Sequence, residues 1–139
     1  MPISAVYKKA ITIPESAIDE NGHVNNVVYV QWMQDIAVEQ YASIGGVEAQ
    51  GANSSWVVRE HRVEYLLPAF AGEEIEIKTW IENIRRVRSL RKYEFVRKSD
   101  GKLLVRGETD WVFVEVKSGR PIAIPDEVMN TFRADPKSL

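Results

Sequence analysis

The longest regular pattern of apolar residues lies between residues 27 and 44, a segment without proline or glycine. Apolar side chains recur there every three or four residues, the spacing that places them on one face of a helix. The stripe consists of Tyr29, Met33, Ile36, Ala37, Tyr41 and Ile44, widened by Val28, Trp32 and Val38. We therefore predict one long helix, apolar around most of its circumference, that other elements of the fold must enclose.

Residues with small side chains mark both ends of this helix. Asn25 or Asn26 suits the N-cap, because a side-chain oxygen there accepts one of the free backbone N–H groups of the first turn. Gly45 and Gly46 are a stop signal, since glycine is favoured just beyond a helix C-terminus. We expect a loop of small residues to follow, as far as Ser54.

The rest of the chain shows the alternation of apolar and polar residues that is typical of strands. Strands are predicted over residues 5–13, 56–67, 74–81, 90–98 and 103–116, and a short helix over 126–132. Asp100 and Gly101 predict a hairpin with a primed turn, which needs positive φ angles. The order is one strand, the long helix and four strands joined by short connections. It predicts an α+β fold in which an antiparallel sheet of about five strands wraps around one long central helix.

Such a sheet has open edges, and one helix cannot cover both of its faces. Exposed strand edges offer unpaired backbone groups to another chain. Edge-to-edge pairing of two copies would satisfy these groups and extend the sheet. We therefore expect a homodimer or a homotetramer.

Composition narrows the class of protein. A chain of 139 residues with 45% hydrophobic and 27% charged residues is typical of a single soluble domain, here residues 1–139, and the cytoplasm is the expected location. Cysteine is absent, which excludes disulfides and thiol nucleophiles. Two histidines make a multi-histidine zinc site improbable, and no metal is expected. A net charge of −2 gives no general attraction to nucleic acid, and no long apolar run indicates a membrane span.

The segment that leads into the helix carries the candidate chemistry. Residues 19–29 read DENGHVNNVVY and are followed by Trp32. This string resembles the active-site motif of the hotdog-fold acyl thioesterases, in the branch of 4-hydroxybenzoyl-CoA thioesterase and the small bacterial acyl-CoA thioesterases. It is also similar to the motif of the plant acyl-carrier-protein thioesterases. The resemblance implies a hotdog fold and hydrolysis of an acyl-CoA or acyl-carrier-protein thioester without a cofactor, with active sites at subunit interfaces.

The resemblance also assigns roles to individual residues. Asp19 matches the catalytic carboxylate, which acts as a nucleophile or as a general base for water. Asn21 and His23 match an asparagine and a histidine that assist it, although His23 serves equally well to close the loop. Asn26 matches the position whose backbone N–H polarises the thioester carbonyl. Two departures stand out: Pro68 lies where the plant enzymes have a further glutamate, and the simplest bacterial members lack a histidine at position 23.

General chemistry agrees with this assignment. Thioester cleavage passes through an oxyanion, which needs preorganised hydrogen-bond donors. The first N–H groups of a helix are unpaired, and the helix dipole favours negative charge there. A carboxylate a few residues upstream can therefore act on the carbonyl carbon while these groups hold the oxygen. Tyr29 is a candidate for substrate binding, and its place in the apolar stripe also suits the core.

A basic run at residues 85–92, RRVRSLRK, has three interpretations. Charge alone suggests nucleic acid, but no aromatic residue interleaves with it. Basic residues on both sides of the alternation suggest an exposed, solvated hairpin. In the hotdog family this hairpin lies near the nucleotide of coenzyme A, which implies phosphate binding by Arg85, Arg86, Arg88 and Ser89. Two alternatives to a thioesterase also stay open, a hotdog dehydratase and a non-catalytic domain that binds acyl thioesters.

Overall fold

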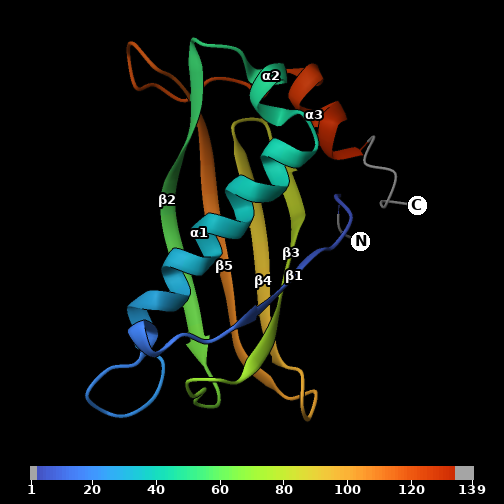
Figure 1. The fold of residues 1–139 in the computed structure, drawn as a ribbon. Helices are drawn as coiled ribbons and strands as arrows, with labels where there is room; N and C mark the ends of the chain where they lie inside the picture. Colours follow the sequence, from blue (N-terminus) through green and yellow to red (C-terminus); the bar gives the residue numbers. More distant parts are fainter. Residues whose placement is uncertain (1–2, 134–139) are drawn as a thin grey trace.

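The computed structural model describes residues 3–133, and in this part five strands form one antiparallel sheet in the order β1-β3-β4-β5-β2. The strands are β1 (Tyr7–Thr12), β2 (Ser54–Tyr65), β3 (Glu74–Arg85), β4 (Arg88–Arg97) and β5 (Leu103–Glu115). The helices are α1 (Asn26–Ser43), α2 (Gly46–Gln50) and α3 (Asp126–Arg133), with a 3₁₀ turn at Glu15–Ala17. Helix α1 lies across one face of the sheet (Figure 1), which confirms the predicted α+β architecture.

Helix α1 begins where the sequence predicts. The Asn25 side chain accepts the backbone N–H of Val27 at 2.9 Å, so Asn25 is the N-cap and Asn26 is the first helical residue. Gly45 follows the helix in the left-handed region, with φ of 83°. The predicted loop after Gly46 is wrong, because Gly46–Gln50 forms the short helix α2. Gly46 has no Cβ, and a Cβ there would meet the Tyr41 ring at 2.2–2.5 Å, so the α1–α2 corner is compact because glycine occupies it.

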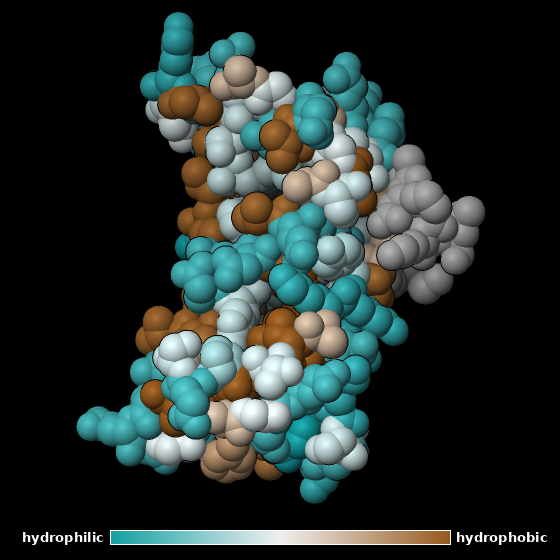
Figure 2. Space-filling view, viewed as in Figure 1, coloured by the Kyte–Doolittle hydropathy of each residue, from teal (hydrophilic) through white to brown (hydrophobic). Residues whose placement is uncertain are grey.

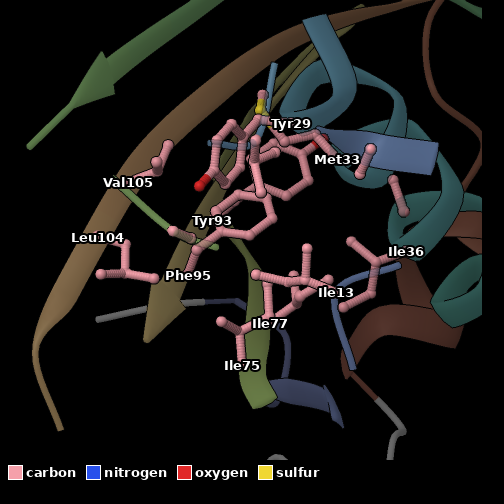
Figure 3. Close-up of a cluster of buried hydrophobic side chains, with 14 residues drawn as sticks. Ile13, Tyr29, Met33, Ile36, Ile75, Ile77, Tyr93, Phe95, Leu104 and Val105 are labelled. Atoms are coloured by element: carbon pink, nitrogen blue, oxygen red, sulfur yellow. The ribbon is translucent and has the colours of Figure 1, made fainter. Parts of the chain in front are cut away.

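The main core lies between α1 and the sheet. Tyr29, Met33 and Ile36 of α1 are at most 2% exposed and pack against buried side chains of the strands. Figure 3 shows these helix residues facing the sheet residues Ile75, Ile77, Tyr93, Phe95, Leu104 and Val105. Burial of this apolar surface fixes the helix on the sheet.

Most of the circumference of α1 is at least partly covered within one chain, and the exposed residues of its middle turns lie along one stripe. This stripe contains the predicted polar residues Gln31 and Asp35, and it also contains Val38, which is 62% exposed although the sequence placed it on the apolar side. Gln40 is fully buried instead, although its polarity gave no indication of this. A polar residue is tolerated there because its amide is hydrogen-bonded, to the carbonyl of Ala5 and to Arg91.

The two hairpins of the sheet differ from the sequence prediction in detail. Strands β3 and β4 extend to Arg85 and Arg88, which pair with each other, so the basic turn is only two residues long. At the β4–β5 hairpin Gly101 has φ of 70°, whereas Asp100 does not adopt a positive φ. The prediction of a primed turn is therefore wrong. Asp100 instead closes the turn through its side chain, which accepts the N–H of Lys102 at 3.1 Å.

Strand β2 is an open edge of the sheet. Its 12 residues pair only with β5 in the described part of the chain. Figure 2 shows hydrophobic surface along the flank of the molecule where β2 lies, and Val57 on this strand is 44% exposed. This edge is available for the self-association that the sequence predicts, and the association stays a prediction. No helix within residues 3–133 has the length and apolar character needed to cross a membrane.

Candidate active site

Asp19 lies on a small closed loop that leads into α1. Ile18 and Val24 form an antiparallel bridge, and the N–H of Asp19 donates to the carbonyl of His23 at 3.1 Å. Gly22 adopts φ of 83° at the tip of this loop, a conformation that favours glycine. The Asp19 carboxylate accepts the N–H of Asn21 at 2.9 Å and is half-buried. The loop therefore holds the carboxylate in a fixed place near the start of the helix.

The loop is attached to the rest of the fold on both sides. The N–H of Asn25 donates to the carbonyl of Ala17 at 2.9 Å, and the N–H of Val24 donates to the carbonyl of Ala69 at 2.9 Å. The Tyr65 hydroxyl at the end of β2 donates to the carbonyl of Asn26 at 2.8 Å. The first turn of α1 is thus positioned by the sheet as well as by its own cap.

The first backbone N–H groups of α1 are not equally free. That of Val27 is bound by the Asn25 side chain, and that of Val28 is bound by the Asn25 carbonyl at 3.0 Å. The N–H of Asn26 has no acceptor among the described residues, and the side chain of Asn26 is exposed. This group is therefore a donor at the helix start that can receive a ligand oxygen.

The structure brings Asp19, Asn21, His23 and Asn26 together on one loop and the adjoining helix start. Asn21 is exposed, while His23 is half-buried with its Nδ1 atom 3.3 Å from the carbonyl oxygen of Val24. Among the described residues, the His23 side chain therefore makes a polar contact only with the adjacent residue, while its backbone carbonyl accepts the N–H of Asp19 and closes the loop. Residues 3–133 contain no group of three or more histidine, aspartate or glutamate side chains arranged to hold a metal ion.

Tyr29 lies in the core rather than at the surface. It is 2% exposed and makes edge-to-face contacts with Trp32, Tyr65 and Phe95, with ring centroids 5.1–5.8 Å apart. Its hydroxyl has no hydrogen-bond partner among the described residues. Burial raises the pKa of Tyr29 to about 12. Its role in substrate binding stays a prediction.

Replacing Tyr29 with phenylalanine is expected to leave the free energy of unfolding at neutral pH within about 1 kcal/mol of the parent, because the buried hydroxyl has no partner to lose. The raised pKa stabilises the folded state below pH 10, and this contribution is lost as the pH rises toward 12. Tyr29→Phe should therefore resist alkaline unfolding better than the parent. Urea titrations at pH 7 and pH 11 measure both effects. A loss above about 2 kcal/mol at pH 7 would reveal a partner for the hydroxyl.

The basic hairpin lies at the other end of the sheet from Asp19 within one chain (Figure 1). Thr12, a few residues before the Asp19 loop, pairs with Glu74 at the start of β3, whereas the hairpin follows Arg85 at its end. A 12-residue strand is about 36 Å long at about 3.3 Å per residue. The structure therefore does not bring the two predicted groups of site residues together in a single chain.

The residues of the basic run differ in burial. Arg85 and Arg86 are exposed, and Arg88 forms an ion pair with Asp110, which also binds Arg59 at 3.0 Å. Ser89 is only 2% exposed and Arg91 only 3% exposed. The interpretation of the run as uniformly solvated is therefore wrong, because Ser89 and Arg91 point to the same side of β4 as the core residues Tyr93 and Phe95.

His61 lies at a second polar cluster that contains no acid. Its Nδ1 atom is 2.8 Å from Thr109 Oγ1, and its Nε2 atom is 3.1 Å from Gln34 Nε2. Burial lowers the pKa of His61, which favours the neutral ring. The Ser54 hydroxyl donates to the carbonyl of Gln50 instead of to a histidine. Within the described residues these side chains therefore form no Ser-His-acid triad.

A family model described as "Thioesterase-like superfamily" matches residues 13–132. No curated protein matches the sequence. The match spans the Asp19 loop, α1 and all strands except β1.

Solved structures share the fold over nearly the whole chain. A 1,4-dihydroxy-2-naphthoyl-CoA thioesterase from Synechocystis has a TM-score of 0.81 and 16% identity, covering 94% of this chain and 97% of its own. A hypothetical protein from Staphylococcus aureus in complex with CoA has a TM-score of 0.85 and 18% identity, covering 99% and 88%. A 12:0-ACP thioesterase from Umbellularia californica has a TM-score of 0.82 and 20% identity, covering 91% of this chain and 49% of its own. These likenesses confirm the predicted hotdog fold.

Proposed function

The chain belongs to the thioesterase-like superfamily, and from this premise we propose that it is an acyl thioesterase that releases a free acid and a thiol from acyl-CoA or acyl-carrier-protein thioesters. The observation that carries the proposal is the pairing of the Asp19 carboxylate with a free backbone donor, the N–H of Asn26, on one short loop and helix start. The CoA bound to a protein of the same fold and the acyl-carrier-protein thioesterase of the same fold support these two thiol carriers.

The proposed reaction places the thioester carbonyl oxygen on the N–H of Asn26. The helix dipole stabilises the negative charge that develops on this oxygen. Asp19 then either attacks the carbonyl carbon, forming an anhydride that water opens, or removes a proton from a water molecule that attacks directly. In both routes the C–S bond breaks and the sulfur leaves as a thiolate. Water supplies the proton that converts it to the thiol, through Asp19 in the general-base route and when water opens the anhydride in the nucleophilic route. Asn21 and His23 assist by holding the loop and the attacking water.

A dimer would complete this site. Strand β2 runs from Ser54, at the hairpin end of the sheet, to Tyr65, which contacts the helix start. If two β2 edges pair antiparallel, the Tyr65 end of one chain lies beside the Ser54 end of the other. The Asp19 loop of one chain then lies toward the basic hairpin of its partner. This arrangement supports a shared site in which Arg85, Arg86 and Arg88 bind the phosphates of coenzyme A.

Replacing Arg85 or Arg86 with alanine is expected to raise the KM for acyl-CoA severalfold and to leave kcat nearly unchanged. The phosphates bind equally in the ground state and the transition state. Loss of a phosphate contact therefore weakens substrate binding without slowing the chemical step. Arg88→Ala should have a smaller effect, because part of its charge is already engaged by Asp110. Steady-state kinetics measures both constants. A short thioester without the nucleotide is the control and should show no change in KM. Binding of nucleic acid that weakens steeply with salt, with no change in KM, would contradict the assignment.

Product analysis separates the proposed reaction from its alternatives. The protein is incubated with a saturated acyl-CoA and with a 3-hydroxyacyl-CoA, and the products are separated by chromatography. A thioesterase yields free acid and CoA from both substrates. A dehydratase would convert only the hydroxyacyl substrate, to an unsaturated thioester, and a non-catalytic binding domain would leave both intact.

A further inference from the structure

A second polar feature lies away from the Asp19 loop, in a pocket of about 190 Å³ beneath α2 and α3. Tyr41, Trp56, Trp111 and Phe132 contribute to its aromatic walls. The pocket is opposite the Asp19 end of the fold, near the beginning of β2 and β4. A cavity of this size has room for a small ligand.

Arg91 is a buried cation that contributes to the lining of this pocket. Its guanidinium donates to Gln40 Oε1 at 2.5 Å and to Thr79 Oγ1 at 3.1 Å, both through Nη1 and both to neutral groups. None of the ion pairs in residues 3–133 includes Arg91. Burial lowers the pKa of Arg91 to about 10, so the side chain still carries its charge at neutral pH. A buried charge without an opposite charge is costly, and proteins seldom retain one without a partner.

Ser89 provides an independent second observation. It lies two residues before Arg91 on the same face of β4, lines the same pocket and is 2% exposed. Its hydroxyl has no hydrogen-bond partner in the described part of the chain. Buried hydroxyl groups are almost always hydrogen-bonded, so an unpartnered one beside a cavity indicates a missing acceptor.

We propose that this pocket is a binding site for a small organic anion, with its carboxylate on Arg91 and Ser89 and its apolar body between the aromatic walls. A carboxylate supplies both features that the pocket lacks, a negative charge for the guanidinium and an acceptor for the hydroxyl. The aromatic side chains cover a flat or short aliphatic body by van der Waals contact. No residue of this pocket belongs to the Asp19 loop of the same chain, so within one chain the site is separate from the proposed catalytic residues.

The anion has two possible sources. It is either a free small acid or the far end of an acyl group that itself carries a carboxylate. The second source rests on the proposed function, because the pocket end of β2 would lie beside the partner's Asp19 loop in an antiparallel dimer. Both sources present the same chemistry to Arg91, and the experiment below separates them.

Equilibrium binding tests the site without any need for hydrolysis. Benzoate and its neutral analogue benzamide are titrated into the protein, and binding is followed by calorimetry and by tryptophan fluorescence, to which Trp56 and Trp111 of the pocket contribute. Benzoate should bind at least about tenfold more tightly than benzamide, since a hydrogen bond to a charged group is stronger than one to a neutral group. Arg91→Gln should weaken benzoate binding at least about tenfold. Ser89→Ala, which removes only an unpartnered hydroxyl and should fold normally, should weaken it about threefold or more.

The control variant is Arg120→Gln, which removes an exposed arginine outside the pocket and should leave benzoate binding unchanged. Thermal unfolding of each variant shows that the fold is retained. Equal affinity for benzoate and benzamide, or unchanged benzoate binding in both Ser89→Ala and Arg91→Gln, would overturn the proposal. So would the absence of saturable benzoate binding in the parent.

A kinetic comparison identifies the source of the anion. If the acyl group supplies it, Arg91→Gln should lower kcat/KM about tenfold for adipoyl-CoA, which ends in a carboxylate, and leave hexanoyl-CoA unaffected. If a free acid supplies it, benzoate binding depends on Arg91 while neither thioester is affected. Benzoate binding that depends on Arg91 in a protein with no hydrolase activity would support the pocket and refute the proposed function alone.

Discussion

Replacing Asp19 with asparagine is expected to lower kcat for thioester hydrolysis by about 10² to 10⁴, the contribution typical of a positioned general base. Asparagine keeps an oxygen that can accept the N–H of Asn21, so the loop should retain its conformation. It removes the negative charge and with it the ability to attack a carbonyl or to deprotonate water. Free-thiol release under saturating substrate measures the loss, and circular dichroism and thermal unfolding should match the parent.

The matched control is Glu20→Gln, the neighbouring acid on the same loop, which is exposed. It changes the net charge by the same amount and should leave kcat within about twofold of the parent, because surface charges are screened by solvent. Asn21→Ala and His23→Ala should fall between these extremes, since assisting groups contribute less than the group that reacts. Near-parental turnover in Asp19→Asn would remove Asp19 from the mechanism.

The second large effect is expected at the open edge of the sheet. Placing lysine at Val57, which is 44% exposed on β2, should convert a dimer to a monomer, because charged lysine side chains oppose edge-to-edge strand pairing. Activity toward acyl-CoA should fall at least about tenfold in parallel, since each site would lose the phosphate-binding hairpin of the partner. Analytical ultracentrifugation at micromolar concentration measures the assembly state.

Val116→Lys is the control for this substitution. Val116 is 57% exposed and lies just beyond β5 rather than on the β2 edge, so this variant should stay dimeric and active. A parent protein that sediments as a stable monomer and still hydrolyses acyl-CoA would contradict both the dimer and the shared site.

Most of the fold could be predicted because local patterns and tertiary packing agree. The spacing of Tyr29, Met33 and Ile36 places them on one helix face, and the structure buries that face on the sheet. The alternation from Glu74 to Ile81 gives a strand with one buried side, as predicted. Asn25 acts as the helix cap because its side chain and position satisfy a requirement that is entirely local.

The failures of prediction come from contacts between residues far apart in the sequence. Gln40 and Arg91 are 51 positions apart, and each is buried because the other provides a hydrogen-bond partner. No local pattern reveals such a pair, and none of the three interpretations of the basic run places Arg91 in the core. The missed α2 helix has a different, short-range reason: the Tyr41 ring packs against Gly46, so glycine here serves close packing, whereas glycine alone indicated a loop.

The candidate site also has one part that the sequence predicts and another part that depends on the tertiary structure. A contiguous motif identifies Asp19, Asn21, His23 and Asn26, and the structure places them on one loop and helix start, while their roles stay predictions. The separation of Asp19 from the basic hairpin by the length of β3 was not predictable, because it depends on the order and direction of the strands. The pocket around Arg91 was missed because its lining comes from all three helices and four of the five strands.

The most direct test of the account is the rate of free-thiol release from a panel of acyl-CoAs that varies in chain length and in aromatic or aliphatic character. The protein contains no cysteine, so it adds no thiol background to the assay. We expect catalytic turnover with at least one member of the panel, and loss of that turnover in Asp19→Asn but not in Glu20→Gln. Thiol release no faster than the uncatalysed rate with every acyl-CoA and acyl-carrier-protein substrate would contradict the proposed function.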